Sequence, residues 1–313
     1  MEFEDIDIPI DTYYAEGNSD DDDVSLTSYV YSTKLSRLEL SVMDRGRTLA
    51  STTTQYRYEN GRRYHAYRDG EYYQPNDEEM NHHEGIAHHL YLVTLDNELH
   101  LAPLENPKRI LDIGTGIGTW AMDMAEKFPE AEILGTDLSP IQADIKPPNV
   151  HFEIDDCLSE WTYPPNHFDM IHMRTMMGSI PDWPALYRKC YEHLAPGGYI
   201  EQAECSINMQ IHEGEISPGS VFETWTKAFY EAGDKWGKTM RTAELMADWI
   251  REAGFVDVVE RRFKWPVGPW SSDPKLKELG RWNLLNWETG MEGWALALYT
   301  RQLKDLDLDL DFV

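Results

Sequence analysis

The stretch ILDIGTGIGTW, residues 110–120, places three glycines at every second position directly after a short apolar run. A buried strand that turns at once into a helix needs glycine: Gly114 can adopt the backbone angles of the turn, and Gly116 lets a ligand approach the main chain. Gly118 allows close packing of the helix. The start of that helix offers free N–H groups and the positive end of the helix dipole. The motif predicts a strand–turn–helix unit that holds a nucleotide-like ligand, with a ligand-free tight turn as the alternative.

Apolar runs that alternate with amphipathic segments predict an α/β fold with a doubly wound, mostly parallel sheet of the Rossmann-like kind. The chain divides into an acidic arm (1–55), an N-terminal lid with a helix (56–105), a ligand-binding core (106–265), and a C-terminal helical cap with an acidic tail (266–313). Helices are expected between the strands. The strands are expected at residues 109–113, 132–136, 150–154, 168–173, 198–204 and 256–264.

Acidic residues at three successive strand ends indicate which ligand this is. Asp112 precedes the first glycine, where a carboxylate favours a ligand with ammonium and sulfonium groups over an anion. Asp137 ends the second strand, 19 residues past Gly118, where a carboxylate can accept both hydroxyls of a ribose. Asp156 and Cys157 follow the third strand, where an adenine edge is expected, although a cap or solvated turn is the alternative for Asp156. Because the spacing G-x-G-x-G also departs from the dinucleotide motif, the predicted cofactor is S-adenosylmethionine.

The formal net charge of −28 argues against direct contact with nucleic acid. Residues 1–24 hold ten carboxylates and no Lys or Arg, yet the body stays acidic without them and would repel a phosphate backbone. No apolar run is long enough to span a membrane, and the first residues lack the pattern of a secretory signal. Three cysteines without metal-ligand spacing indicate reduced thiols, so a cytoplasmic or nuclear protein is expected.

Beyond the glycine turn, the sequence resembles the class I S-adenosylmethionine-dependent methyltransferases, and more narrowly the LaeA-type methyltransferases of fungi. The resemblance covers about residues 56–299. The glycine turn and Asp137 are shared by the whole class, whereas YENGRRYHAYRDGEYYQPNDEE, DWPALY and KWPVGPW narrow it. It implies an enzyme that methylates a small molecule of the secondary-metabolite kind. The alternative is a LaeA-type regulator of secondary metabolism that acts through protein partners, with weak or no activity.

The resemblance also implies roles for residues around the predicted crevice. Tyr64, Tyr67 and Arg68 would belong to the lid, where Tyr64 would bind the cofactor and Arg68 would be a partner for the cofactor carboxylate. At the end of the fourth strand, Met173 would contact the cofactor. The other implied cofactor-binding residues are Asp112, Gly114, Gly116 and Gly118 at the methionine part, Asp137 and Leu138 at the ribose, and Asp156 and Cys157 at the adenine.

Methyl transfer from a sulfonium requires alignment of the reacting atoms, and it requires a base only when the acceptor must lose a proton. His172 and Arg174, at the end of the fourth strand, are the predicted catalytic residues. His172 is the best candidate for the base, and a structural histidine inside the sheet is the alternative. The paired histidines lack the further ligands of a metal site, so no metal is expected. Six aromatic residues are expected either to pack the core or to wall an acceptor pocket: Trp225, Phe229, Tyr230, Trp282, Trp287 and Trp294.

The C-terminal segment departs from the resembled family. Members continue past the stretch that matches LYTR with a helix and a last strand that inserts antiparallel into the sheet, whereas this chain reads QLKDLDLDLDFV. Leucines alternate with aspartates there, which indicates either a makeshift edge strand or a frayed acidic tail. If the final strand is missing, the sheet has an open edge beside residues 256–264. We expect a protein partner, if there is one, at this edge or at the acidic arm.

Overall fold

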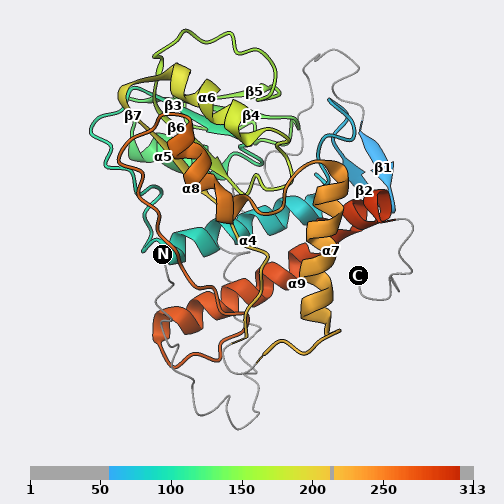
Figure 1. The fold of residues 1–313 in the computed structure, drawn as a ribbon. Coiled ribbons are helices and arrows are strands. Elements are labelled where there is room, and N and C mark those ends of the chain that lie inside the picture. Colours follow the sequence, from blue (N-terminus) through green and yellow to red (C-terminus); the bar gives the residue numbers. More distant parts are fainter. Residues whose placement is uncertain (1–55, 212–214, 304–313) are drawn as a thin grey trace.

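The computed structural model of the protein describes residues 56–211 and 215–303, and its centre is a five-stranded parallel sheet (Figure 1). The strands lie in the order β5-β4-β3-β6-β7, and every neighbouring pair is parallel. The chain therefore runs outward from β3 to β5 and then returns to β6, which puts the topological switch point beside β3. Five of the six predicted strands are confirmed: β3 (Arg109–Ile113), β4 (Glu132–Asp137), β5 (Val150–Ile154), β6 (Phe168–Arg174) and β7 (Leu194–Ala203).

Helices cover both faces of the sheet, because alternate residues of each strand point to opposite faces. On one face, Ile110 and Met170 pack against α5 (Thr119–Lys127). On the other face, Leu111 and Ile171 pack against α6 (Trp183–His193) and α8 (Thr242–Glu252). This arrangement confirms the predicted doubly wound α/β fold.

The starts of the helices follow from the local sequence. Asp182 accepts a hydrogen bond from the Ala185 N–H at the start of α6, and Asp273 accepts one from the Leu276 N–H at the start of α9 (Pro274–Gln302), both at 2.9 Å. The helix α5 begins differently. Its N-cap is Gly118 with a φ of 81°, and no side chain caps it locally. The N–H groups of this turn bond within the chain instead: those of Gly114 and Thr115 donate to the Thr136 carbonyl, and that of Gly118 donates to the Thr115 carbonyl.

A second group of helices lies over the carboxyl ends of the strands. It consists of α4 (Glu78–Thr94), α7 (Val221–Trp236) and α9, with α4 packed along α9 (Figure 1). A hairpin of β1 (Arg57–Glu59) and β2 (Arg62–Tyr64) precedes α4 and was not predicted. Arg301, near the end of α9, holds this hairpin through an ion pair with Glu59 at 2.7 Å. The N-terminal lid thus contains the expected helix and an additional hairpin.

The strand predicted at residues 256–264 is not formed. These residues follow α8 without pairing with any described strand, and Val256 is 83% exposed. Alternating polarity alone does not make a strand, because its backbone groups need a ladder partner. Among the described residues, β7 is thus an edge of the sheet, and no antiparallel strand joins it. The predicted arm at 1–55 and the predicted tail strand within 304–313 lie outside the described residues.

The described ranges hold no helix that is both long and apolar enough to cross a membrane.

Candidate active site

The glycine turn between β3 and α5 lies at a large cavity, and two side chains, those of Met176 and Glu84, approach its main chain closely. Gly114 and Gly116 have φ values of 69° and 55°, in the left-handed region that favours glycine. A Cβ on Gly114 would lie 2.2 Å from the Sδ of Met176, and one on Gly116 would lie 2.3 Å from the Oε2 of Glu84. Both glycines line a large cavity at the carboxyl ends of the strands. Side chains at these two positions would fill the floor of that cavity.

Three residues assigned to the cofactor from the sequence do not line this cavity, and two of them, Gly118 and Met173, have packing roles instead. A Cβ on Gly118 would lie 2.4 Å from the ring of Phe152, so this glycine permits close packing of α5 against β5. Met173 is fully buried in the apolar cluster between the sheet and α6. The alternation along β6 turns Met173 to the face opposite His172. Both cofactor assignments are therefore wrong: Gly118 has a packing role, and Met173 belongs to the core.

Asp137 ends β4 and faces the glycine turn. Its Oδ2 accepts a hydrogen bond from the Gly116 N–H, and its Oδ1 accepts one from the Ser139 N–H, both at 2.9 Å. Burial raises the pKa of Asp137 to about 6, and the two N–H donors act against that rise. The carboxylate is thus held in one orientation, and each oxygen keeps a lone pair for a further donor. Leu138, the next residue, also lines the cavity.

Asp112 and His172 form a buried pair below the turn. The Oδ1 of Asp112 lies 2.8 Å from the Nδ1 of His172, and its Oδ2 accepts a hydrogen bond from the Thr115 hydroxyl at 2.6 Å. The imidazole stacks on the Trp120 ring with centroids 3.6 Å apart. Since a carboxylate oxygen accepts at Nδ1, the neutral imidazole carries its proton there. Nε2 is then the nitrogen that can accept a proton.

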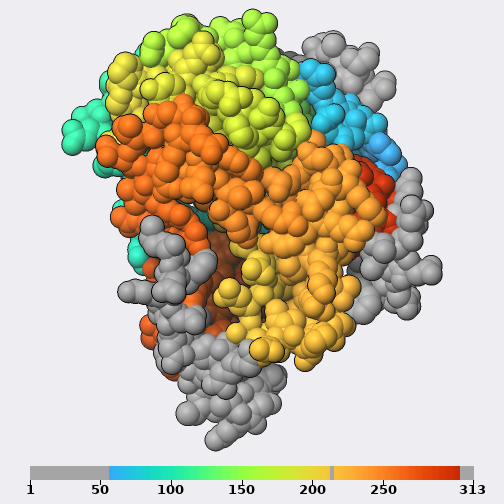
Figure 2. Space-filling view, viewed as in Figure 1, coloured from blue at the N-terminus to red at the C-terminus, as the bar shows by residue number. Residues whose placement is uncertain are grey.

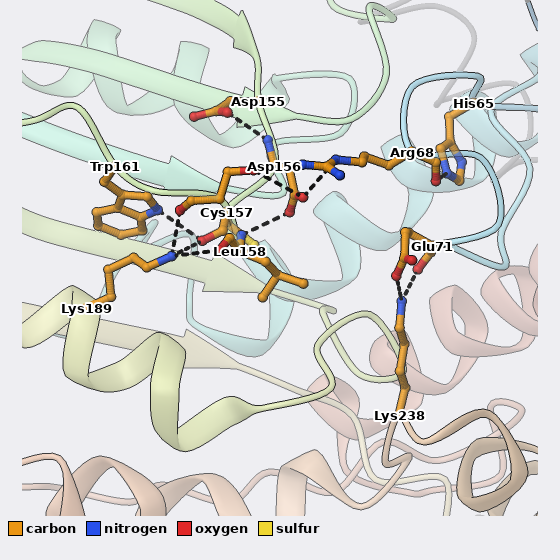
Figure 3. Close-up of polar contacts among 11 residues, drawn as sticks. His65, Arg68, Glu71, Asp155, Asp156, Cys157, Leu158, Trp161, Lys189 and Lys238 are labelled. Atoms are coloured by element: carbon orange, nitrogen blue, oxygen red, sulfur yellow. Dashed lines mark hydrogen bonds and ion pairs between the residues drawn. The ribbon is translucent and has the colours of Figure 1, made fainter.

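The turn after β5 holds Asp156 and Cys157 (Figure 3), and both residues line the cavity. Asp156 accepts a hydrogen bond from the Leu158 N–H at 2.9 Å, so it caps this turn, the alternative that the sequence left open. Burial raises the pKa of the Cys157 thiol to about 12. Lys189 of α6 donates to three main-chain carbonyls and thereby fixes the turn: those of Cys157, Leu158 and Ser159.

The two lid residues assigned to the cofactor lie in different places. The Nε of Arg68 lies 3.2 Å from the Oδ2 of Asp156, as Figure 3 shows. This is the adenine end of the predicted cofactor. Tyr64 does not line the cavity. It is buried beneath the guanidinium of Arg301, which lies 4.9 Å from the centre of its ring. The assignment of Tyr64 to the cofactor is therefore wrong, whereas the assignment of Arg68 to the cofactor carboxylate stays a prediction.

Arg174 lies on the same face of the sheet as His172 and contacts α4. Its Nη2 donates to the Nδ1 of His88 at 3.1 Å, and its guanidinium lies over the Tyr91 ring at 4.7 Å. The Nε2 of His88 is in turn 2.9 Å from the Oδ2 of Asp123. Burial lowers the pKa of Arg174, yet guanidinium groups remain charged in proteins. This network places a cation in the cavity wall near the glycine turn.

Glu84 of α4 is a site residue that the sequence analysis missed. Its Oε2 accepts a hydrogen bond from the Ile117 N–H at 2.9 Å. Burial raises the pKa of Glu84 to about 7, and the nearby Asp137 acts in the same direction. The spacing of Glu84, His88 and Tyr91 places the three side chains on one face of a helix, and the sequence alone indicates this shared face. Nothing in the sequence indicates, however, that this face covers the glycine turn.

One cavity of about 2190 Å³ connects the strand ends to the helical cap. Figure 2 shows a hollow between the orange and the gold segments, with the brown of α9 deep inside. At the sheet, the lining includes all three predicted acidic residues, Asp112, Asp137 and Asp156. Of the six aromatic residues considered from the sequence, four line the cavity, and they come from α7 and α9: Trp225, Phe229, Trp287 and Trp294.

The other two aromatic residues pack elsewhere. Trp282 is buried against α4, with its ring 4.1 Å from that of His89. Tyr230 lies beneath the guanidinium of Arg241. For these two, core or surface packing was the right interpretation.

Comparison with known proteins agrees with the site. Residues 86–260, more than half of the chain, match a family described as "Methyltransferase domain". The chain is 43% identical to "Methyltransferase pytC" of Aspergillus terreus over 258 residues, which cover 82% of this chain and 79% of the relative. The chain belongs to the methyltransferase family. This methyltransferase is also 36% identical to "Secondary metabolism regulator LAE1" of Cochliobolus heterostrophus, over 78% of this chain and 81% of the relative.

A further relative is "Protein-methionine methyltransferase laeA" of Emericella nidulans, at 33% identity over 80% of this chain and 68% of the relative. Among solved structures, the phosphoethanolamine N-methyltransferase 2 of Haemonchus contortus in complex with S-adenosyl-L-methionine is 20% identical, with a TM-score of 0.41. The match covers 78% of this chain and 51% of that one. The predicted class I methyltransferase of LaeA type, with S-adenosylmethionine as its cofactor, is confirmed by the matched family, the relatives and the parallel sheet.

Proposed function

We propose that this methyltransferase methylates a flat or apolar small molecule bound in the aromatic part of the cavity. The observation that carries the proposal is the continuity of one cavity from the three aspartates to the four aromatic side chains of α7 and α9. Aromatic walls bury flat apolar ligands well. The volume of about 2190 Å³ also exceeds that of a typical small-molecule pocket, about 300–1000 Å³, so it has room for an acceptor beside the cofactor.

The described residues fit the cofactor. When bound, S-adenosylmethionine supplies an electrophilic methyl group on a sulfonium. Gly114 and Gly116 line the cavity, and Asp137 offers oriented lone pairs to the ribose hydroxyls. Besides Arg68, Arg174 suits the carboxylate, because its guanidinium lies in the cavity wall near the glycine turn. Glu84 suits the ammonium group of the cofactor, because it also lines the cavity at the glycine turn and its carboxylate has the opposite charge.

Labelled cofactor added to an extract of host metabolites tests the proposal. We expect the label in an apolar, solvent-extractable compound of low mass. Trp287→Ala should reduce this transfer at least tenfold, because the variant removes apolar contact area from the acceptor wall. Its affinity for S-adenosylmethionine, measured by calorimetry, should stay unchanged.

The matched control is Tyr58→Ala, which removes an aromatic ring that is 71% exposed and outside the cavity, and which should transfer label normally. Label found only in protein would contradict a small-molecule acceptor and would favour the regulatory alternative. The cytoplasmic or nuclear location expected from the sequence stays a prediction.

We also propose that His172 is the general base when the acceptor must lose a proton. With Nδ1–H directed at Asp112, Nε2 can accept a proton, and the adjacent carboxylate stabilises the imidazolium. His172→Gln should therefore lower kcat about 10²–10⁴-fold while the Kd of the cofactor changes by less than about threefold. Turnover assays with the acceptor measure kcat, and calorimetry measures the Kd of the cofactor, so the two quantities are determined separately. Full turnover in this variant would leave only a positioning role for His172.

The raised pKa of Glu84 predicts a pH dependence of cofactor binding. With a pKa of about 7, Glu84 is largely neutral at pH 6 and charged at pH 8. Since a carboxylate attracts the cofactor ammonium, affinity should rise between pH 6 and 8 and then level off. Calorimetry across this range should show a larger rise in the native chain than in Glu84→Gln, in which Asp137, with a pKa of about 6, still titrates. Equal pH profiles would contradict the assignment.

The same group gives a stability readout without cofactor. Between pH 4.5 and 7, Glu84 is mostly protonated in the folded chain, where its pKa is about 7. In the unfolded chain, where its pKa is 4.5, it is mostly ionised over the same range. The free energy of unfolding therefore falls as pH rises through this window, and the lost stability stays lost above it. Glu84→Gln should remove this loss and stabilise the apo protein at pH 8 by about 2 kcal/mol. The control Glu79→Gln, an exposed carboxylate on the same helix, should change neither quantity.

A further inference from the structure

The strand β7 has an open side. In the described part of the chain, its ladder partner is β6, and no strand pairs with its other side. A strand directs its N–H and C=O groups alternately to its two sides, so every second pair along β7 points away from β6. Such an edge favours the addition of another extended segment.

The opposite wall of this open side consists of residues 255–264. Residues 197–203 of β7 and residues 255–264 line the same cavity, so a space separates them, which we call the β7 groove. Figure 2 shows residues of the orange segment at the border of the hollow. Three apolar side chains of this wall are exposed: Val256 at 83%, Val259 at 76% and Phe263 at 48%. Exposed apolar side chains beside an open strand indicate a missing apolar neighbour.

The groove also reaches the apolar core of the domain. Ile200 of β7 and Phe255 and Val258 of the opposite wall pack against the cluster between the sheet and α6. An apolar side chain that enters between the two walls would therefore extend an existing core. A segment with apolar residues at every second position fits this groove better than a helix does, because its backbone can also bond to β7.

The amino-terminal segment EFEDIDIPI, residues 2–10, has this pattern. Ile6, Ile8 and Ile10 occupy alternate positions, and isoleucine favours strands. In a strand, the backbone N–H and C=O groups of every second residue point to the same neighbouring strand. The backbone groups of these three isoleucines can therefore bond to β7, while Pro9, which lacks an N–H, faces the other side. Proline is tolerated in a strand under that condition only.

Charge and reach both favour this segment. Residues 1–24 carry ten carboxylates and no Lys or Arg, whereas the wall at residues 255–264 carries three basic and two acidic side chains, a net charge of +1. The 45 residues between Ile10 and Tyr56 can extend to about 150 Å, which exceeds any path across a domain of this size.

The acidic segment at 304–313 is less suited. It follows α9, which ends beside the β1–β2 hairpin, on the opposite side of the molecule from β7 in Figure 1. Its ten residues extend to about 35 Å at most, and part of that length would be used to reach the groove.

We propose that residues 5–10 of this chain bind in the β7 groove as an added strand, hydrogen-bonded to β7. The added strand covers Val256 and Val259 beside residues 197–203. This role of the arm is independent of the proposed acceptor.

Hydrogen exchange of the full chain tests the proposal. In the native chain, outward amides among residues 199–203 are expected to exchange slowly. In Ile6→Asp/Ile8→Asp, they should exchange at least tenfold faster, because the charged side chains cannot enter the apolar groove. The matched control is Val24→Asp/Leu26→Asp, which places the same charges in the arm outside the segment and should exchange like the native chain. Unchanged exchange of the β3 amides 110–113 shows that the fold is intact in each variant.

Three results would overturn the proposal. The first is equal exchange of β7 in the native chain and in Ile6→Asp/Ile8→Asp. The second is that Leu308→Asp/Leu310→Asp, and not the arm variant, speeds the exchange of β7, which would make the C-terminal segment the occupant. The third is protection of β7 that disappears on dilution, since binding within one chain does not depend on concentration.

Discussion

Asp137→Ala is expected to abolish detectable binding of S-adenosylmethionine and leave the sheet folded. The carboxylate is held by the N–H groups of Gly116 and Ser139, so its free lone pairs point to fixed positions in the cavity. Two hydrogen bonds from ribose hydroxyls to a buried carboxylate are worth about 3–5 kcal/mol together, which corresponds to a loss of affinity of about 10²–10³-fold or more. Calorimetry with the purified chain measures this loss.

The matched control for Asp137 is Glu132→Ala. Glu132 begins the same strand at its far end and is exposed, so its removal changes the charge of β4 by the same amount without touching the cavity. We expect native affinity in this variant. A Kd within threefold of the native value in Asp137→Ala would refute the ribose assignment.

Gly116→Ala is expected to have the second large effect, on both binding and stability. At a φ of 55°, an alanine costs about 1–2 kcal/mol of backbone strain. Its Cβ would also lie 2.3 Å from the Oε2 of Glu84, so this carboxylate must leave the Ile117 N–H or the turn must move. We therefore expect at least 100-fold weaker cofactor binding and a Tm lower by several degrees, measured by calorimetry and thermal denaturation.

Gly61→Ala separates the backbone strain from the collision. Gly61, in the hairpin turn, has a φ of 79°, and no atom lies within 4 Å of the Cβ that alanine would add. This variant should lower Tm by a similar backbone contribution and bind the cofactor normally. If Gly116→Ala also bound normally, the turn would not be the floor of the cofactor site.

The sequence predicted the parts of the site that depend on one strand and its following turn. Asp112, Asp137 and Asp156 were placed correctly at the cavity, because a parallel sheet brings all carboxyl ends of its strands to one edge. Met173 was misplaced, because residues 172–174 at the end of β6 were all expected to face the cofactor. Adjacent residues of a strand point to opposite faces of the sheet, so Met173 points into the core.

Residues from the lid could not be placed in the same way. The ion pair of Arg68 with Asp156 was not foreseen, and Glu84 was missed altogether. Arg68 and Glu84 both precede the sheet in the chain, and their position at the crevice depends on how α4 and the lid pack over the strand ends. The sequence of α4 carries no information on that packing. The pattern of apolar and polar residues shows which face of a helix is buried, but it does not show which segment covers that face.

The sequence by itself determined the doubly wound sheet, the glycine turn and the identity of the cofactor, because these follow from local periodicity and from the backbone freedom of glycine. Only the tertiary structure decided the open side of β7. Residues 256–264 have a strand-like pattern, but a strand forms only where a neighbour supplies backbone partners, and no described segment does so. The tertiary structure also decided the acceptor cavity, because Trp287 of α9 reaches the strand ends through packing between segments far apart in the chain.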